Sequence, residues 1–289
     1  MYVTQFGGAQ VARILIATGA IDSTVAVGLS PREIVRDNSG HLYAANFLSN
    51  TVSRIDVATF TVDAVIPVGA APYGVAWDGR SHMYVTNSAA ATVSRILIAT
   101  GAVDAVIPVG NNPIGVGWDG RDHMYVCNHT GGDSVSRILI ATGAVDLTIP
   151  LAAGSLPYSI AWDGAAHMYA VDSGTNDISR IIIATGALEP VTPIGVNPYG
   201  VAFDGSAHMY AGNQTDNTVS RLLVATGAVD LVTPVSVDPL AIAWDGGAHM
   251  YVCNIGGPTV SRILVATGAV DLVIPVPGSP WGVAWDGIW

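Results

Sequence analysis

The sequence predicts an all-β protein, a seven-bladed β-propeller of four-stranded antiparallel blades that forms one domain over residues 1–289. Three observations support this prediction: a repeated unit, four apolar segments within each unit, and two chain ends that supply complementary parts of one unit. The units begin near residues 1, 41, 82, 123, 167, 208 and 249. A period of about 40–50 residues with four strands per repeat is typical of propeller blades.

The four apolar segments are clearest in the third unit, where they cover 83–86, 93–98, 103–109 and 114–118. β-Branched residues dominate them, and none is long enough for a typical helix. An Asn-rich or Gly-rich loop, Ala-Thr-Gly, Gly-x-x-Pro and Asp-Gly separate the segments. Because Gly tolerates positive φ and Asp hydrogen-bonds the backbone of its own turn, each break predicts a reversal of chain direction.

The two chain ends predict how the ring closes. The chain begins with Met-Tyr-Val, a first segment, and its last unit stops at Trp-Gly-Val-Ala-Trp over 281–285, a fourth segment. An open solenoid would instead need polar capping repeats at both ends. We therefore expect the C-terminal strand to complete the blade that the N-terminal strand begins.

An arginine precedes an acidic residue by nine positions in every unit, with Ala-Thr-Gly, or Ala-Thr-Phe in the second unit, between them. A tight hairpin places such residues opposite each other on neighbouring strands, where a pair contributes about 0.2–1 kcal/mol. These arginines are therefore expected to be structural. The pairs are Arg13/Asp22, Arg54/Asp63, Arg95/Asp104, Arg137/Asp146, Arg180/Glu189, Arg221/Asp230 and Arg262/Asp271.

The charge balance argues against several classes of partner. The net charge is −11, and all eleven cationic side chains are arginine. An acidic surface repels phosphate backbones and anionic lipids, so we expect neither nucleic acid nor a membrane surface as a partner. Every apolar run is interrupted well before the roughly 20 residues of a transmembrane helix. We expect a soluble monomer.

The cysteines and the N-terminus leave the compartment open. Cys127 and Cys253 occupy the same place in units three repeats apart, so we expect two free thiols on nearly opposite sides of the ring. The N-terminal sequence MYVTQFGGAQ lacks a basic region and an apolar core, so no signal peptide is expected. A cytoplasmic protein and a secreted protein whose signal has been removed both agree with this.

Several motifs resemble the YVTN-type propeller repeat, which is related to NHL-type propellers and to streptogramin lyase-like proteins. They are Met-Tyr-Val-Thr-Asn at 83–87, Thr-Val-Ser-Arg-Ile, Ala-Thr-Gly, and Ile-Pro-Val-Gly followed by Pro-x-Gly-Val-Ala. The resemblance covers the whole chain and implies that Pro-x-Gly-Val-Ala-Trp forms the innermost strand beside a central channel. These groups include surface-layer, binding and enzymatic members.

The resemblance to streptogramin lyases also implies a metal ion bound with His and Glu side chains. This chain departs from that pattern, because it contains only two glutamates, Glu33 and Glu189. Glu189 stands at an arginine-pairing position. The lyase site therefore does not map onto the sequence, and a divalent cation is the one cofactor that remains to be considered.

The first candidate site is a ring of Asp-Gly-x-x-His turns, because Asp and His are metal ligands. The alternative is that each Asp caps its turn and each His bonds back to the hairpin, which the near-perfect repetition favours. We therefore assign no metal ligand. The aspartates are Asp37, Asp78, Asp119, Asp163, Asp204, Asp245 and Asp286, and the histidines are His41, His82, His123, His167, His208 and His249.

The second candidate is a break in the repeat. Where the third unit has Pro-Tyr-Gly-Val-Ala-Trp at 72–77, residues 31–36 are Pro-Arg-Glu-Ile-Val-Arg. Arg32 and Glu33 are expected near one channel mouth and Arg36 near the other. An arginine there can bind a carboxylate or phosphate, and Glu33 can act as a base or ligand. An internal ion pair or sequence drift would explain the same residues.

The third candidate is the ring of residues that precede the glycine of that strand. Mostly aromatic with one arginine, such a ring suits a planar, sugar-like or peptide ligand at a channel opening. Packing between blades is the alternative. The members are Arg32, Tyr73, Ile114, Tyr158, Tyr199, Leu240 and Trp281.

The fourth candidate is the set of loops between first and second segments, which vary most and should open on the same face as that ring. His129 is the only histidine outside the Asp-Gly-x-x-His turns, and Asp133, Asp172, Asp177 and Asp216 occupy nearby loop positions. They suggest a cation site, with ordinary solvated turns as the alternative. The sequence has no Gly-rich phosphate loop, paired metal-ligand cysteines or Gly-x-Ser-x-Gly elbow.

Three hypotheses about function follow. The first, which we prefer because most polar residues repeat, is a non-catalytic binding scaffold that takes a small molecule, glycan or peptide at the channel mouth. Its ligand-binding residues would be Arg32, Arg36, Tyr73, Tyr158, Tyr199 and Trp281. The second is a lyase-like enzyme with Glu33 and His129 as catalytic residues, an analogy of fold. The third is an engineered or recently amplified repeat protein without an evolved ligand, which the near-identity of the units and the absence of lysine also fit.

Overall fold

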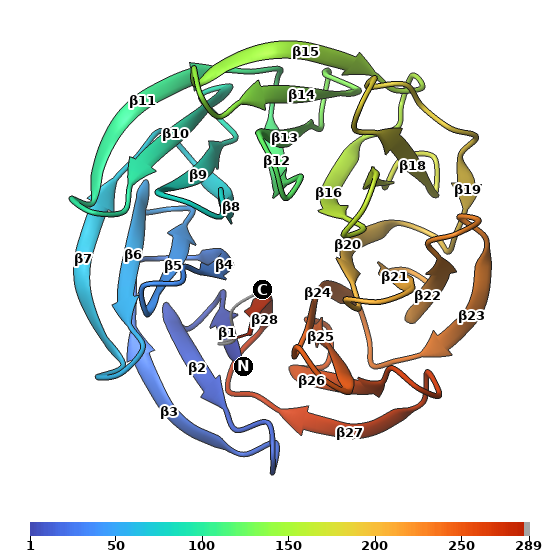
Figure 1. The fold of residues 1–289 in the computed structure, drawn as a ribbon. Coiled ribbons are helices and arrows are strands. Elements are labelled where there is room, and N and C mark those ends of the chain that lie inside the picture. The colour runs from blue at the N-terminus through green and yellow to red at the C-terminus, as the bar shows by residue number, and fades with distance from the viewer. Residues whose placement is uncertain (286–289) are drawn as a thin grey trace.

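The computed structural model describes residues 1–285. Over these residues, seven four-stranded antiparallel sheets surround a central channel as the blades of a propeller (Figure 1). The predicted fold class is confirmed.

No helix in the described part of the chain is long and apolar enough to cross a membrane.

The four strands of a blade occupy four concentric positions. The innermost strands all begin at a proline, whose missing N–H is tolerated at the start of a strand. They are β4 (Pro31–Arg36), β8 (Pro72–Trp77), β12 (Pro113–Trp118), β16 (Pro157–Trp162), β20 (Pro198–Phe203), β24 (Pro239–Trp244) and β28 (Pro280–Ala284). The second-position strands are β1 (Tyr2–Gln5), β5 (His41–Asn46), β9 (His82–Asn87), β13 (His123–Asn128), β17 (His167–Asp172), β21 (His208–Asn213) and β25 (His249–Asn254).

The two outer positions complete each blade. The third-position strands are β2 (Gln10–Ile14), β6 (Thr51–Asp56), β10 (Thr92–Leu97), β14 (Ser134–Leu139), β18 (Asp177–Ile182), β22 (Thr218–Leu223) and β26 (Thr259–Leu264). The outermost strands are β3 (Ile21–Ala26), β7 (Thr61–Pro67), β11 (Ala102–Pro108), β15 (Ala144–Pro150), β19 (Thr192–Pro193), β23 (Val229–Pro234) and β27 (Val270–Pro275).

Each blade combines parts of two sequence units, because the fourth segment of a unit is the innermost strand of the next blade. The first blade is therefore β28-β1-β2-β3, and the second to seventh blades follow in order from β4. β28 pairs antiparallel with β1, with Val3 opposite Val283 and Tyr2 opposite Ala284. The predicted closure of the ring is confirmed.

The core lies between neighbouring blades. One buried cluster, for example, joins Tyr84 and Val93 of the third blade to Met124 and Ile138 of the fourth. Second-position strands such as β9 are buried over nearly their whole length, since blades cover both of their faces. The outermost strands alternate between partly buried and exposed side chains, because only one face is covered.

The hairpins between the third and outermost strands hold the predicted arginine–acid pairs. All seven form, with closest N–O distances of 2.7–2.9 Å. The last residue of the intervening turn has positive φ, and it is glycine except for Phe60 in the second blade, whose φ is 52°. The two cysteines are free, as predicted, and both are buried.

Candidate functional site

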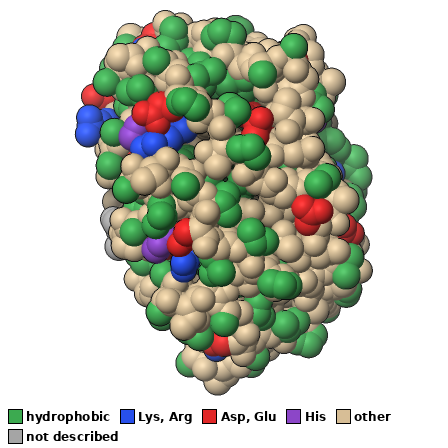
Figure 2. All heavy atoms as spheres, turned by 90° about the vertical axis from the view of Figure 1, so that its right-hand side faces the viewer, with side chains coloured by type: hydrophobic (Ala, Val, Ile, Leu, Met, Phe, Trp, Pro, Cys, Tyr) green, Lys and Arg blue, Asp and Glu red, His purple; other side chains and the backbone are tan. Residues whose placement is uncertain are grey.

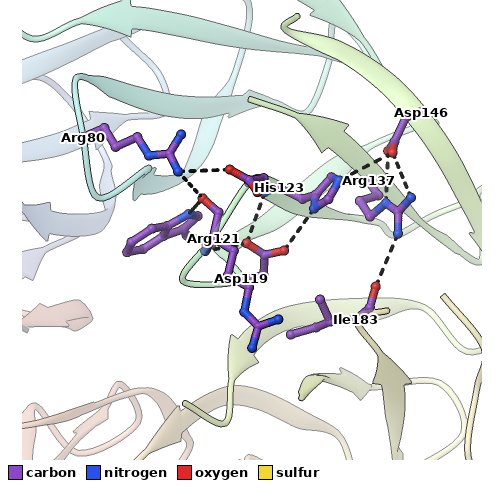
Figure 3. Close-up of polar contacts among 9 residues, drawn as sticks. Arg80, Asp119, Arg121, His123, Arg137, Asp146 and Ile183 are labelled. Carbon is purple, nitrogen blue, oxygen red and sulfur yellow. Dashed lines mark hydrogen bonds and ion pairs between the residues drawn. The ribbon is translucent and has the colours of Figure 1, made fainter. Parts of the chain in front are cut away.

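The Asp-Gly-x-x-His turns form structural networks in the described blades. In the fourth blade, Asp119 Oδ1 accepts hydrogen bonds from the backbone N–H groups of Arg121 and His123, at 2.9 and 3.1 Å (Figure 3). Asp119 Oδ2 lies 3.1 Å from His123 Nδ1. The other ring nitrogen of His123 faces Asp146 Oδ2 at 3.6 Å, and Asp146 in turn pairs with Arg137.

This series of contacts runs from the inner turn to the outermost strand. It recurs in the five other blades that have a histidine at this position. On the edge of the ring in Figure 2, histidine, arginine and acidic side chains accordingly gather in small groups. Among residues 1–285, no group of three or more His, Cys, Asp or Glu side chains is arranged to hold a metal ion. Asp286, the seventh member of the aspartate ring, lies outside the described residues.

Four aromatic side chains close one end of the central channel. Tyr73, Tyr158, Tyr199 and Trp281, here called the aromatic rim, lie at the start of β8, β16, β20 and β28. The hydroxyl groups of Tyr73 and Tyr158 are hydrogen-bonded to each other, although their blades are not adjacent. The ring centroids of Tyr158 and Tyr199 are 4.2 Å apart, and those of Tyr73 and Trp281 are 6.2 Å apart. The rim therefore forms a cap across the channel.

The loops between second- and third-position strands open on the same face as the rim, as predicted. Pro72, at the start of β8, pairs with Asn87, at the end of β9. The N–H of Ser88 in the following loop then donates to the carbonyl of Ala71. These contacts place the variable loops directly around the channel mouth.

A cavity of about 260 Å³ lies beneath the rim. Its walls are the inner faces of the rim and apolar side chains of the innermost strands, such as Val75, Val116 and Val201. Among the described residues of this lining, Glu33 is the one acidic residue, none is cationic, and Ser159 adds a hydroxyl group. The cavity is thus a mainly apolar chamber with a single carboxyl group.

Glu33 occupies a repeat position that holds glycine in β8, β12, β20 and β28. Its Oε2 accepts a hydrogen bond of 3.3 Å from the backbone N–H of Val75. Gly74 leaves room for this carboxyl, since a Cβ there would lie 3.3 Å from Oε2 and 2.3 Å from the carbonyl oxygen of Ile114. The accessible part of Glu33 faces the channel and not the outer surface of the protein. Burial raises the pKa of its carboxyl group to about 7.

Arg32 lies beside the rim, but not on the cavity wall. Its Cζ is 3.7 Å from the ring centroid of Trp281, 4.4 Å from Phe6, 4.8 Å from Phe47 and 5.1 Å from Tyr73. Nε and Nη1 are buried without a hydrogen-bond partner in the described structure, and burial lowers the pKa of the guanidinium group. No ion pair among the described residues joins Arg32 to Glu33, so a guanidinium in an aromatic cage replaces the internal ion pair that the sequence also allowed.

Arg36 lies at the opposite end of β4, where β8, β12 and β16 carry tryptophan. Its Nε and Nη1 are buried without a hydrogen-bond partner among residues 1–285. The residues predicted to bind ligand therefore divide between the two ends of the channel, with Arg36 apart from the others.

His129 lies on the β13–β14 loop, outside the cavity. Its ring centroid is 5.7 Å from that of Tyr158, its Nδ1 is 2.7 Å from Thr130 Oγ1, and burial lowers its pKa. Tyr158 also lines the cavity that Glu33 faces, whereas His129, the other predicted catalytic residue, is not part of that lining. The structure does not bring these two residues together.

The position of His129 in the repeat is that of Phe6 and Phe47. Each of the three contacts the rim-level residue of the following blade: Phe6 with Arg32, Phe47 with Tyr73, and His129 with Tyr158. Sequence reasoning missed Phe6 and Phe47, although alignment of the residue that follows each second segment would have revealed them.

Two of the loop aspartates accept hydrogen bonds from backbone N–H groups of nearby turns. Asp133 accepts hydrogen bonds from the N–H groups of Gly154 and Leu156, at 2.9 and 3.2 Å. Asp216 accepts one of 2.7 Å from the N–H of Val196. These contacts favour turn stabilisation over a cation site.

Asp172 is different, because it is fully buried at the end of β17. Its Oδ2 accepts a hydrogen bond of 2.6 Å from Ser179 Oγ, whereas Oδ1 has no partner in the described structure. Burial, with the nearby carboxyl of Asp177, raises the pKa of Asp172 to about 8. Other second-position strands carry an amide at this place: Gln5, Asn46, Asn87, Asn128, Asn213 and Asn254.

The comparisons with known proteins support the fold. No family model matches the chain, and no curated protein matches it by sequence. Hydrazine synthase from Kuenenia stuttgartiensis is 20% identical, with a TM-score of 0.81 over 92% of both chains. Virginiamycin B lyase from Staphylococcus aureus is 17% identical, with a TM-score of 0.78 over 89% of both chains.

A functionally unknown protein from Desulfotomaculum acetoxidans is 11% identical, with a TM-score of 0.82 over 97% of this chain and 96% of the other. At these identities the likeness concerns the propeller architecture. The sequence resemblance to YVTN-type repeats remains an interpretation.

Proposed function

We propose that the protein is a non-catalytic binding scaffold that holds a compact ligand in the channel cavity beneath the aromatic rim. The observation that carries the proposal is the asymmetry of this chamber. Seven similar strands converge on it, and one of them places a carboxyl group inside, whereas four aromatic side chains cap it. Apolar pockets with a few converging polar groups are the usual form of small-molecule sites.

The size of the cavity limits the ligand. Its volume of about 260 Å³ lies below the roughly 300–1,000 Å³ of typical pockets for drug-sized ligands. A small molecule, or the terminal group of a glycan or peptide whose remainder lies across the loop face, fits this volume. We further propose that the protein acts as a monomer whose net charge of −11 keeps it from nucleic acid and membrane surfaces.

A channel-filling variant tests the proposal. Ala241 lines the cavity, so Ala241→Trp would occupy it, whereas Ala99→Trp places the same side chain on the exposed β10–β11 hairpin, away from the channel mouth. We expect compounds found by ligand-observed NMR in a small-molecule library to lose binding to Ala241→Trp and to retain it with Ala99→Trp. Compounds that bind Ala241→Trp as well as the native protein would favour a repeat protein without an evolved ligand, and so would a library without hits.

A lyase is the second candidate, favoured by one specific observation. Glu33 has a pKa raised to about 7 and shares its chamber with the hydrogen-bonded hydroxyls of Tyr73 and Tyr158. A carboxylate with this pKa is suited to accept a proton from carbon, and a tyrosine hydroxyl is suited to protonate a leaving oxygen.

The lyase hypothesis has its own test. Quinupristin, the compound named with one similar lyase structure, is a suitable first substrate. If the protein is such a lyase, quinupristin should be consumed by the native protein and by Glu189→Gln, but not by Glu33→Gln, as followed by chromatography. Equal consumption by Glu33→Gln would remove Glu33 as the base.

A further inference from the structure

Within residues 1–285, the carboxyl group of Glu33 has no cationic partner in the chamber that it faces. Its one hydrogen bond to a described residue comes from the neutral N–H of Val75, at 3.3 Å, and Arg32 lies outside the lining. A carboxylate removed from bulk water is stabilised chiefly by an opposite charge. The missing counter-charge therefore indicates that a ligand in the chamber would carry a positive charge.

The walls of the chamber narrow the choice of cation. Divalent metal ions prefer several oxygen ligands, and the lining offers Glu33 as its only carboxylate. The remaining surface is largely aliphatic and aromatic, which suits an organic cation with an apolar body. An anion would meet an uncompensated carboxylate and is disfavoured by charge.

Arg32 shows that the mouth of this channel accommodates an organic cation. Its guanidinium group lies within 3.7–5.1 Å of four aromatic ring centroids, and two of its nitrogens are buried without hydrogen-bond partners in the described structure. The π faces of these rings compensate a buried positive charge. Tyr73 and Trp281 belong both to this cage and to the cavity wall.

We infer that the channel ligand is a compact organic cation whose primary ammonium group pairs with Glu33 while its apolar body fills the chamber. This inference rests on the proposed function, since it names the class of ligand for the same cavity. The ammonium donates to the Glu33 carboxylate and to nearby tyrosine oxygens, and charge-assisted bonds of this kind are about twice as strong as neutral ones.

A matched pair of probes tests the inference with the full-length protein. Cyclohexylamine carries a primary ammonium on an apolar ring, and cyclohexanol has a similar shape without the charge. By isothermal titration calorimetry at pH 8.5, we expect the amine to bind at least about tenfold more tightly than the alcohol. The preference should disappear in Glu33→Gln and persist in Glu189→Gln, which alters the only other glutamate at an outer hairpin.

The dependence on pH provides a second readout. Because Glu33 ionises near pH 7 and an alkylamine stays protonated up to about pH 10, affinity should rise about 30-fold from pH 5.5 to 8.5. The same titration with Glu33→Gln should be flat. If Glu33→Gln does not fold, as judged by its thermal unfolding, Ala241→Trp replaces it and should abolish binding of the amine.

The outcomes separate this inference from the proposed function. Equal binding of amine and alcohol that Ala241→Trp abolishes would overturn the ammonium assignment and leave a channel-binding scaffold. Binding of Mg²⁺ or Ca²⁺ that depends on Glu33, without binding of cyclohexylamine, would overturn the ligand class. Failure of both probes, together with a compound library without hits, would overturn both proposals.

Discussion

Two adjacent side chains of β4 illustrate how strongly local surroundings decide the role of a charge. Arg32 is stabilised by the faces of aromatic rings, whereas Glu33 extends into an apolar chamber and keeps a single weak hydrogen bond. Both replace residues that recur in the other units. The same departure from the repeat thus produces a cation that contacts aromatic faces and an acid that has one long hydrogen bond among the described residues.

Replacing Arg32 by glutamine should destabilise the protein. The substitution removes the cation–π contacts with Trp281, Phe6, Phe47 and Tyr73, each worth about 0.5–2 kcal/mol. We expect a loss of about 1–3 kcal/mol in the free energy of unfolding, measured by urea denaturation. Arg80→Gln is the control, because its pair with Asp122 is solvent-exposed and contributes little. Equal stability of the two variants would refute the role of the cage.

Asp172→Asn should stabilise the protein most at alkaline pH. The folded state holds the Asp172 proton up to about pH 8, whereas the unfolded chain releases it near pH 4. The unfolded state therefore binds fewer protons over this range, and the free energy of unfolding falls as pH rises from about 4 to 8. Asparagine removes this loss and can donate to Ser179, as Asn213 does to Ser220.

Urea unfolding at pH 5 and pH 8.5 measures the effect. We expect Asp172→Asn to gain about 1–3 kcal/mol over the native protein at pH 8.5 and less at pH 5. The reverse change in the next blade, Asn213→Asp, is the matched control and should introduce a similar loss at high pH. A stability difference independent of pH would show that Asp172 does not carry a raised pKa.

Turns and strands follow the sequence pattern closely, and their exceptions have local causes. β19 is reduced to Thr192–Pro193. The corresponding strands β23 and β27 continue as Val-Asp-Leu, whereas this hairpin continues as Leu-Glu-Pro with Pro190, which cannot donate to a ladder. The described Asp-Gly turns have a second constraint, because an aromatic ring of the following blade lies against each glycine. The ring is an indole except at Gly164, where it is that of Phe203.

Two glycine substitutions separate backbone strain from contact between blades. Gly101 has φ of 67°, and an added Cβ would have no neighbour closer than 3.7 Å. Gly79 has φ of 72°, and its added Cβ would approach the Trp118 ring to 2.0 Å. We expect Gly101→Ala to cost about 1–2 kcal/mol and Gly79→Ala about 3 kcal/mol or more in urea unfolding. Equal costs would show that the indole moves aside freely.

At the level of the complete ring, the repeat predicted the architecture because each unit carries its own strands, turns and charge pairs. The closure between β1 and β28 followed from the complementary ends. Because Tyr73, Tyr158, Tyr199 and Trp281 share one repeat position, the sequence predicts that they lie at the same end of the channel. Sequence position alone indicates neither that these side chains meet across the mouth nor that Arg32 turns toward them.

Those features depend on contacts between blades that are distant in sequence. The hydroxyls of Tyr73 and Tyr158, for example, meet over the intervening blade. For Asp172, the sequence predicts a position in a variable loop, whereas the structure buries this side chain at the end of β17, where the other blades carry an amide. An acid that replaces an amide of similar shape leaves the pattern of apolar residues unchanged, so that pattern does not reveal the burial.

Deleting the chain from Pro280 onward should destabilise the whole ring. β1 would lose its partner β28, and Thr4 would lose its contacts with Gly282. We expect a large fall in melting temperature and association through the exposed strand edge, seen by size-exclusion chromatography. A permutant with its original ends linked and new ends in the loop at Ala89–Ala90 keeps this pairing and should stay monomeric. An unchanged melting temperature after the deletion would contradict this expectation.

The pairing of β1 with β28 also means that the first blade can be completed only when synthesis of the chain is nearly finished. Thr4 and Gly282 are separated by 278 positions along the chain. At roughly 5–20 residues per second, a ribosome needs on the order of 15–55 s to make the intervening segment. During that interval the inner edge of β1 has no native partner, so cotranslational protection of this short edge would govern the yield of folded protein.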